Sequence, residues 1–356
     1  MTVPGELSRR SLLRGAAGLL AVAGLGACGS KSDPALAQAR PTGNPTGQPS
    51  SAPTPSAAAK DPAEIKANEL GLVPVMMFHR ITETVAGDYD TTPAAFRERL
   101  KTMFEAGYRP VRSIDLAKGQ LNVAAGYTPA VMSFDDGYPD QFAIDQAGNV
   151  DPATGIGIML DVCKQFPDCP PAGSLNINKD PFGISDPAAQ QRALQLLDKL
   201  GFEIANHTFN HDNLSQLSDA AVAEDLVKLQ DLVHASVPGA AVRTMALPFG
   251  VRPHNRTLLK TGAYNGEDYT FDGVLLVGAN PSASPFSSTF DPQAIPRIRN
   301  ATGHGDVDYA ATYWMNHFTA HPEQRYISAG NPGHVTVPKA MASRIAPDYR
   351  ERLITY

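Results

Sequence analysis

The sequence predicts an α/β fold built around a parallel sheet. Short apolar runs alternate with amphipathic helical patterns from about residue 70 onward. The helical patterns carry start and stop residues, and the conspicuous polar residues directly follow the apolar runs. Alternation of this kind is typical of parallel sheets whose faces are covered by helices. In such folds the functional side chains gather at the carboxyl ends of the strands.

The predicted strands are apolar runs that end in a polar residue or a turn. They are "VPVMMFH", ending at His79, "AVMSFDD", ending at Asp135 and Asp136, "FEIANH", ending at His207, and "VRTMALPFG", ending at Pro248-Phe249-Gly250. The predicted helices lie between these runs, over residues 92–107, 186–201 and 217–236. Thr92 and Asp186 are expected N-caps, each followed by Pro in the first turn, and Gly107 and Gly201 are expected stops.

The N-terminus has the pattern of an export signal. Arginines precede an apolar run from Gly15 to Ala27, which is too short and too rich in Gly and Ala to span a membrane. "SRRSLL" resembles a twin-arginine signal, and "LGAC" resembles a lipobox in which Cys28 becomes the lipidated first residue. We therefore predict a signal peptide at 1–27 and a lipidated Cys with a flexible tether rich in Pro, Ser, Gly and Ala at 28–68.

This order predicts a lipoprotein whose domain, residues 69–356, is held outside the cytoplasm on the bacterial cell membrane. The remaining cysteines, Cys163 and Cys169, form a closely spaced pair, which predicts a disulfide in that compartment. The formal net charge of −6 and the pI near 5.8 argue against a nucleic-acid partner. We expect a monomer.

Two histidines and two aspartates form a candidate metal site. In "NHTFNH", His207 and His211 are four residues apart, so one helical turn would place both imidazoles on one side. Asp136 offers a third, oxygen ligand, and two His with one carboxylate leave positions open for water. Asp135 would then lie beside that water and accept its proton. Taken alone, Asp-Asp-Gly is equally typical of a turn in which Gly137 has a positive φ.

The motifs "SFDDG", "NHTFNH" and "LPFG", in that order, resemble those of the polysaccharide deacetylases, the carbohydrate esterase family 4 or NodB-homology group. The resemblance covers roughly residues 70–300. It implies a distorted (β/α) barrel that removes acetyl groups from amino sugars or from O-acetylated sugars. It also implies roles for single residues: Asp135 as general base, Asp136, His207 and His211 as metal ligands, and Pro248, Phe249 and Gly250 as a groove wall.

Two departures from the family pattern concern an arginine and a histidine. The family usually has an Arg at the start of its third motif, where this chain has Ala246; Arg297, in "IPRIRN", or Arg243 is a candidate replacement. Arg297 is therefore grouped with the groove residues as substrate-binding. The family usually ends with an apolar strand that closes on a histidine acting as general acid. This strand is missing near the C-terminus here, but the early strand "VPVMMFH" ends in His79. This resembles the circularly permuted branch of poly-N-acetylglucosamine deacetylases, with His79 as general acid.

The resemblance therefore implies a metal-dependent hydrolase that removes N-acetyl groups from poly-N-acetylglucosamine or a related cell-surface glycan. The expected cofactor is a divalent metal, Zn²⁺ before Co²⁺ or Ni²⁺. Peptidoglycan and O-acetylated xylan remain alternative substrates. Two further alternatives are a non-catalytic glycan-binding lipoprotein with the same fold and a tethered metal-binding protein.

Overall fold

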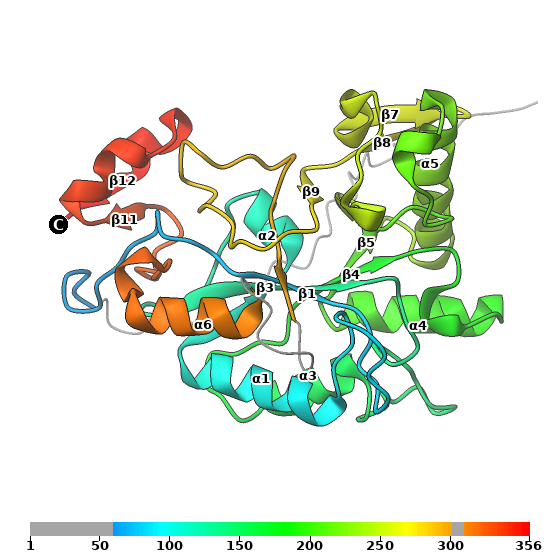
Figure 1. The fold of residues 1–356 in the computed structure, drawn as a ribbon, viewed down its shortest axis with the longest axis horizontal. Helices are drawn as coiled ribbons and strands as arrows, with labels where there is room; N and C mark the ends of the chain where they lie inside the picture. Colours follow the sequence, from blue (N-terminus) through cyan, green and yellow to red (C-terminus); the bar gives the residue numbers. More distant parts are fainter. Residues whose placement is uncertain (1–59, 301–309) are drawn as a thin grey trace, which may run out of the picture. The chain divides into compact units, whose positions relative to one another are not determined.

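A computed structural model describes residues 60–300 and 310–356 (Figure 1). The predicted signal peptide, Cys28 and most of the predicted tether lie outside these residues. The chain is packed into the fold slightly before the predicted boundary at residue 69: Ala67 is fully buried, and the Asn68 N–H donates to the carbonyl of Ile327 at 2.9 Å. Among the described residues, no helix is long and apolar enough to cross a membrane.

The predicted parallel sheet is confirmed. Its order is β10-β1-β3-β4-β5-β6-β9, with β2 paired to β3, and every pairing is parallel. The strands are β1 (Val75–Phe78), β2 (Tyr108–Val111), β3 (Thr128–Asp135), β4 (Ser174–Ile177), β5 (Glu203–Asn206), β6 (Thr244–Ala246), β9 (Gly273–Leu275) and β10 (Ile298–Arg299). The first strand of the chain therefore lies between β3 and the last strand of this sheet.

The sheet curves into a distorted barrel through the segment that leads into β10. Ile295 pairs in parallel with Leu275 of β9: its N–H donates to Val274 at 2.9 Å, and its carbonyl accepts from Leu276 at 2.8 Å. Three residues later, Ile298 pairs with Met76 of β1. The segment 295–299 thus joins the two ends of the sheet, as the predicted barrel requires.

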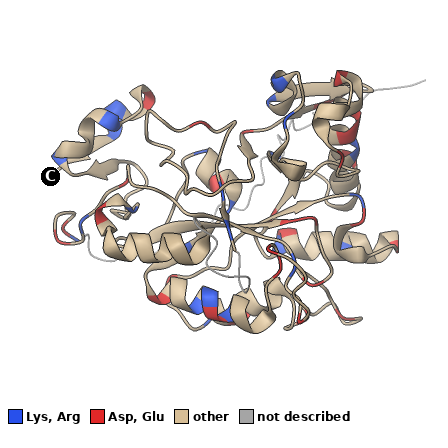
Figure 2. Ribbon diagram, viewed as in Figure 1, with Lys and Arg blue, Asp and Glu red and all other residues tan. Residues whose placement is uncertain are grey.

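Helices surround this sheet, and the predicted caps are present. The helices are α1 (Pro93–Glu105), α2 (Ser113–Ala117), α3 (Gly155–Cys163), α4 (Pro187–Lys199), α5 (Asp219–Ser236) and α6 (Ala311–Ala320). Thr92 accepts from the N–H of Ala95 and Asp186 from that of Ala189. Gly107 and Gly201, with φ of 86° and 87°, end α1 and α4. Charged residues of both signs lie along α1 and α5 (Figure 2).

The apolar face between the sheet and its helices is filled with aromatic side chains. Phe78 of β1 packs against Phe134 of β3 and Phe96 of α1, with ring centroids 5.2 and 5.1 Å apart. All three side chains are buried, and each contributes on the order of 1.5–3 kcal/mol relative to an exposed position. This packing fixes the end of β3, where the acidic pair lies.

The remaining elements pack around this core. The hairpin of β7 (Thr261–Tyr264) and β8 (Glu267–Thr270) adjoins α5. The C-terminal strands β11 (Val335–Val337) and β12 (Leu353–Thr355) pair in parallel. Glu69 anchors them: its carboxylate accepts from the N–H groups of Thr336 at 2.7 Å and Ala329 at 3.0 Å.

Candidate metal centre

A turn of the backbone at the end of β3 directs the two neighbouring aspartate side chains to different partners. Asp135 is the last residue of the strand and is 1% exposed, while Asp136 and Gly137 both have left-handed backbones, with φ of 74° and 64°. A non-glycine residue in this region is uncommon and carries a conformational cost. The turn sends the two carboxylates to different partners: Asp136 faces two histidines, and Asp135 faces an arginine.

Asp136, His207 and His211 form a group that could hold a metal ion, with their ligand atoms all within 4.8 Å of one another. Oδ1 of Asp136 lies 3.3 Å from Nε2 of His207 and 3.2 Å from Nε2 of His211. Two ligand atoms that each lie about 2.0 Å from one tetrahedral Zn²⁺ are roughly 3.3 Å apart. The separations therefore fit two bonds to one small ion, and a His₂-carboxylate donor set suits a borderline-soft divalent metal.

Hydrogen bonding, burial and charge act differently on the three candidate ligands: burial lowers the pKa of His207, but Asp135 and Asp136 outweigh it and raise this pKa in the metal-free site. Nδ1 of His207 lies 2.9 Å from the carbonyl of Ala246, so this nitrogen carries a proton and Nε2 is the nitrogen that remains to bind a metal. Burial, reinforced by the charge of His207, lowers the pKa of His211. Burial opposes the charged form of Asp136, but hydrogen bonding to His207 outweighs it, and the pKa of Asp136 is lowered. A neutral His and an ionised Asp are the forms that bind metals.

The predicted helical turn between the two histidines is wrong. Residues 207–213 form a loop after β5, and two of them, Thr208 and His211, have left-handed backbones. Side chains support this strained loop: Asn206 Oδ1 accepts from the N–H of Thr208 at 2.8 Å, and Thr208 Oγ1 accepts from the N–H of His211 at 3.0 Å. The histidines converge because local hydrogen bonds replace the helix that four-residue spacing suggested.

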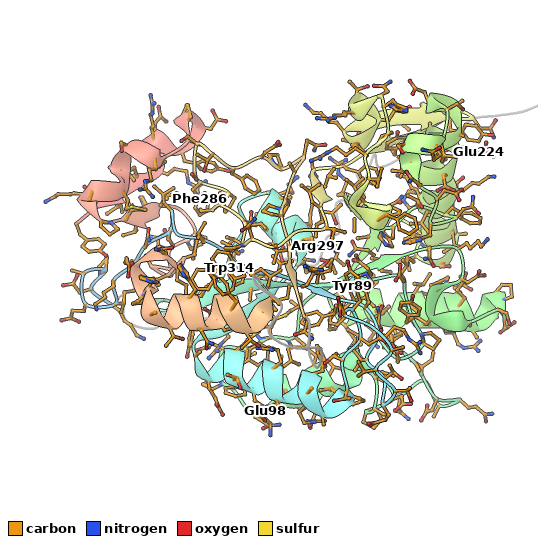
Figure 3. All side chains as sticks on the ribbon, in the orientation of Figure 1. Tyr89, Glu98, Glu224, Phe286, Arg297 and Trp314 are labelled. Carbon is orange, nitrogen blue, oxygen red and sulfur yellow. The ribbon has the colours of Figure 1, made fainter. Side chains whose placement is uncertain are left out.

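Arg297 lies at the centre of the molecule, directly before β10 (Figure 3). Its guanidinium is fully buried and holds Asp135 with two hydrogen bonds, Nη1 to Oδ1 and Nη2 to Oδ2, both 2.7 Å. Its Nε donates to the carbonyl of Leu276 at 2.6 Å. Grouping Arg297 with the substrate-binding residues was wrong, because every one of these contacts is internal. The hypothesis that Arg297 occupies the place of an arginine at Ala246 agrees with its contact to Asp135, whereas Arg243 pairs with Asp272.

The Arg297 guanidinium determines the charge of Asp135. Burial would raise the pKa of this carboxyl, but Arg297, with His207 and His79, holds the pKa far below its ordinary value. Asn176 also donates to Oδ1 at 2.8 Å. Oδ2 accepts only from Arg297 among the described residues, so one of its lone pairs still faces the site.

His79 completes the group around Asp135. Its Nε2 lies 3.8 Å from Oδ2 of Asp135, and burial lowers the pKa of the imidazole although both aspartates favour its charged form. Gln141 holds the two residues together, because its Nε2 donates to the backbone carbonyls of His79 at 2.7 Å and Asp135 at 2.6 Å. The Tyr89 ring packs against His79 with centroids 4.7 Å apart.

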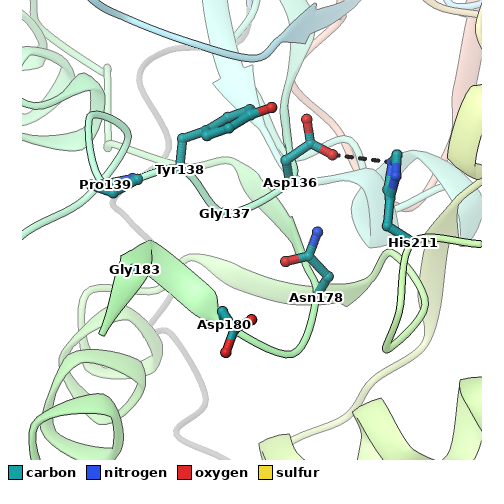
Figure 4. A pocket seen from close by; sticks show the side chains of 8 residues that line it. All are labelled: Asp136, Gly137, Tyr138, Pro139, Asn178, Asp180, Gly183 and His211. Atoms are coloured by element: carbon teal, nitrogen blue, oxygen red, sulfur yellow. Dashed lines mark ion pairs between the residues drawn. The ribbon is translucent and has the colours of Figure 1, made fainter. Parts of the chain in front are cut away.

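A pocket of about 320 Å³ opens beside Asp136 and His211 (Figure 4). Tyr138, Asn178 and Asp180 are polar residues of its wall that the sequence interpretation missed. Asn178 and Asp180 directly follow β4, a strand that was not predicted from "SLNI". The rule that polar residues at strand ends carry function would have found them had β4 been assigned.

The predicted groove wall at Pro248–Gly250 adjoins the metal ligands rather than this pocket. Pro248 is buried, whereas the Phe249 side chain is 63% exposed and its ring packs edge-on against His211 with centroids 4.7 Å apart. Phe249 and Gly250 have left-handed backbones, with φ of 57° and 69°. An exposed ring beside a candidate metal ligand can contact the face of a bound sugar.

The predicted disulfide is not formed in this structure. Cys163 and Cys169 are buried free thiols whose Sγ atoms lie 3.4 Å apart, well beyond the bond length of about 2.05 Å. The thiols face each other in a hydrogen-bond contact, and this contact raises the pKa of Cys163 and lowers that of Cys169. The two cysteines are therefore neighbours, as predicted, but they are in contact as thiols and are not joined by a disulfide.

Residues 177–269 match the family model described as polysaccharide deacetylase. This segment belongs to the polysaccharide deacetylase family. It includes His207, His211 and the turn at 248–250, whereas Asp135, Asp136 and His79 precede it. The deacetylase segment thus supplies two of the three candidate ligands, and the barrel brings the third to them.

Solved deacetylase structures share low identity with the chain. A Bacillus cereus polysaccharide deacetylase has 16% identity and a TM-score of 0.49, covering 69% of this chain and 68% of that chain. The Streptococcus pyogenes deacetylase PplD, solved in complex with acetate, has 14% identity and a TM-score of 0.49, covering 69% and 97%. IcaB from Ammonifex degensii has 15% identity and a TM-score of 0.44, covering 71% and 97%.

Proposed function

We propose that the protein is a metal-dependent hydrolase that removes N-acetyl groups from an amino-sugar polysaccharide, poly-N-acetylglucosamine or a related cell-surface glycan. The main support for this proposal is that the two neighbouring aspartates at the end of β3 have different partners. Asp136 faces two histidines in a metal-binding arrangement, while its neighbour Asp135 is held ionised beside His79. Hydrolysis of an amide needs both a Lewis acid and a residue that moves protons.

Asp136, His207 and His211 would hold the ion, with Zn²⁺ as the proposed metal. When bound, such an ion polarises the acetamide carbonyl and makes a nearby water more acidic. Asp135 accepts the proton of the attacking water on Oδ2, the oxygen that faces His79. Because Arg297 lowers the pKa of Asp135, this carboxyl stays ionised until the water attacks.

His79 acts as the acid in the second half of the reaction. As the C–N bond breaks, its protonated imidazole gives a proton to the departing sugar amine, and acetate is the other product. Burial lowers the pKa of His79, which makes the imidazolium a stronger proton donor. The backbone N–H of Phe249, next to His211, is proposed to help hold the oxyanion of the tetrahedral intermediate.

The test is acetate release from N-acetylglucosamine oligomers by the full chain, metal-stripped and Zn²⁺-restored. We expect release only in the metal-loaded protein and a fall of about 10²- to 10⁴-fold in Asp135→Asn. Asp198→Asn, which removes the same charge from the exposed face of α4, should match the wild type. Metal-independent release would contradict the proposal. Release only from peptidoglycan fragments or acetylated xylan would indicate that one of those polymers is the substrate. Binding without release would indicate a non-catalytic glycan-binding protein.

We also propose that the chain is a lipoprotein, anchored through Cys28 on the outer side of the bacterial cell membrane. The support is the order of signal pattern, lipobox, tether and domain in the sequence. The mass of the mature N-terminal peptide tests this directly: a diacylated Cys28 is expected, and an unmodified Cys28 would refute the anchor.

A further inference from the structure

The pocket beside the metal centre carries a negative charge that the proposed reaction does not use. Asp180 follows β4, is exposed, and makes no side-chain cap to the helical turn that it precedes. In the described part of the chain its carboxylate has neither a hydrogen-bond partner nor an ion pair. The neighbouring Lys179 is exposed and forms no ion pair within the same residues. The charge of Asp180 is therefore available to a ligand.

No other group of the pocket wall compensates this charge. Among the residues that the structure describes, the wall contains no Lys or Arg, and its remaining members are Asp136, Gly137, Tyr138, Pro139, Asn178, Gly183 and His211. His211 is one of the candidate metal ligands, which bind a metal in the neutral form, and Tyr138 offers an uncharged phenol. Arg80 lies over the Tyr138 ring but pairs with Asp140 at 3.4 Å.

The arrangement separates Asp180 from the metal centre. Asn178 lies between Asp180 and the pair formed by Asp136 and His211 (Figure 4). A ligand in the pocket can thus place one group at the metal ligands and another at Asp180. The volume of about 320 Å³ is at the lower end of the range of small-molecule pockets and suits one sugar ring rather than a longer piece of polymer.

We propose that this pocket binds the ammonium group of a glucosamine unit that is adjacent, in the polymer, to the N-acetylated sugar at the metal centre. The proposal rests on the proposed function. Asp180 supplies the counter-charge, Asn178 a hydrogen-bonding amide, and Tyr138 a neutral aromatic surface against the ring. The protein then acts faster on a chain that is already partly deacetylated than on a fully acetylated one.

The kinetic test compares two oligosaccharides of equal length, one fully N-acetylated and one with a single glucosamine next to an N-acetylated unit. For wild-type protein with Zn²⁺, we expect kcat/KM to be about fivefold higher for the glucosamine-containing chain, the effect of one exposed ion pair. This preference should shrink at high salt and disappear in Asp180→Asn. Asp198→Asn is the charge-matched control and should keep it.

Two kinetic results would overturn the proposal. One is a wild-type preference ratio of one or less. The other is an equal loss on both oligosaccharides in Asp180→Asn, which would indicate that Asp180 binds sugar hydroxyls rather than an amine.

A binding measurement separates the failure of this inference from the failure of the deacetylase proposal. Calorimetry with Zn²⁺-loaded Asp135→Asn compares glucosamine and N-acetylglucosamine oligomers of equal length, with and without Asp180→Asn. If wild type releases no acetate, but the glucosamine oligomer binds more tightly and Asp180→Asn removes that difference, the deacetylase proposal fails and the ammonium subsite stands. Equal binding of both oligomers would overturn the subsite.

Discussion

Two buried carboxylates in the same sheet are held in opposite ways. Asp135 ends β3 and is bound by the guanidinium of Arg297. Glu203 begins β5 and, within residues 60–300 and 310–356, accepts hydrogen bonds only from uncharged donors: the hydroxyls of Thr244 and Ser174 and the N–H of Ile114. Both are nearly inaccessible, at 1% and 6% exposure. They differ in whether a cation is hydrogen-bonded to the carboxylate.

The partners explain why the two pKa values move in opposite directions. Burial raises the pKa of Glu203, and its neutral donors do not offset this, whereas Arg297 lowers the pKa of Asp135 against the same effect of burial. Glu203 joins β4, β5, β6 and the first turn of α2 by hydrogen bonds, which is a structural role. Asp135 keeps its charge where β3 ends beside the metal ligands. A buried carboxylate that must remain ionised needs a paired cation.

Removing the guanidinium of Arg297 should have the largest effect on the free energy of unfolding. Arg297→Met leaves the Asp135 carboxylate buried and unpaired, and breaking a buried pair in this way costs about 3–5 kcal/mol of unfolding free energy. Acetate release should fall as well, because the pKa of Asp135 rises and the carboxyl becomes protonated. Urea unfolding, monitored by circular dichroism, measures the first effect.

Arg243→Met is the matched control for this prediction. Arg243 also holds an aspartate with two hydrogen bonds, to Asp272 at 2.9 Å each, but its side chain is 39% exposed. Its loss should therefore cost less than about 1 kcal/mol. The double variant Arg297→Met/Asp135→Asn should recover part of the lost stability, since no unpaired charge remains. Equal costs for Arg297 and Arg243 would contradict the distinction between buried and exposed pairs.

The second prediction concerns Glu203 and pH. Because its folded pKa is raised above the ordinary value of 4.5, stability contributed by this group is fully present below pH 4.5 and declines as pH rises through the folded pKa. Glu203→Gln does not titrate at this position. The unfolding free energy of the wild type should therefore fall relative to Glu203→Gln over that range, by about 1–3 kcal/mol, the cost of an imperfectly compensated buried group. A difference that is constant with pH would show that the three donors keep the pKa at its ordinary value.

The contrast between these carboxylates also shows what the sequence could predict. The helices α1, α4 and α5 were predictable because caps such as Thr92 and stops such as Gly107 act within a few residues, whereas α2, α3 and α6 were not predicted. The grouping of Asp136 with His207 and His211 came from the spacing of the two histidines and from the family resemblance, and it agrees with the rule that carboxyl ends of parallel strands meet. These inferences need only local patterns, motifs and the fold class.

The partners of Arg297 and Glu203 could not be predicted without the three-dimensional register of the strands. The choice between Arg297 and Arg243 depends on how the segment 295–299 closes the barrel, which no local pattern specifies. Glu203, inside the apolar run "FEIANH", carries no signal that its carboxylate faces hydroxyls from two neighbouring strands. The left-handed backbone of His211 was missed because four-residue spacing is typical of a helix.

The smallest expected effect concerns two serines that are register partners in adjacent strands. Ser133 of β3 pairs with Ser174 of β4. Ser174 donates to Glu203, whereas Ser133 accepts from Arg297 at 3.0 Å and from Asn176 at 2.9 Å. Each Ser→Ala change should cost about 1 kcal/mol of unfolding free energy, the net value of a typical hydrogen bond.

The two serine variants should differ in catalysis, although they cost the same in stability. Ser133→Ala removes an acceptor that positions the Arg297 guanidinium on Asp135, so acetate release should slow and its pH profile should shift. Ser174→Ala should leave both unchanged, because Glu203 is separate from the proton-transfer residues. A shifted pH profile in Ser174→Ala would show that the polar interior of the barrel acts as one electrostatic unit, with Glu203 coupled to Asp135. An unshifted profile in Ser133→Ala would show that two hydrogen bonds to Asp135 are enough to hold Arg297 in place.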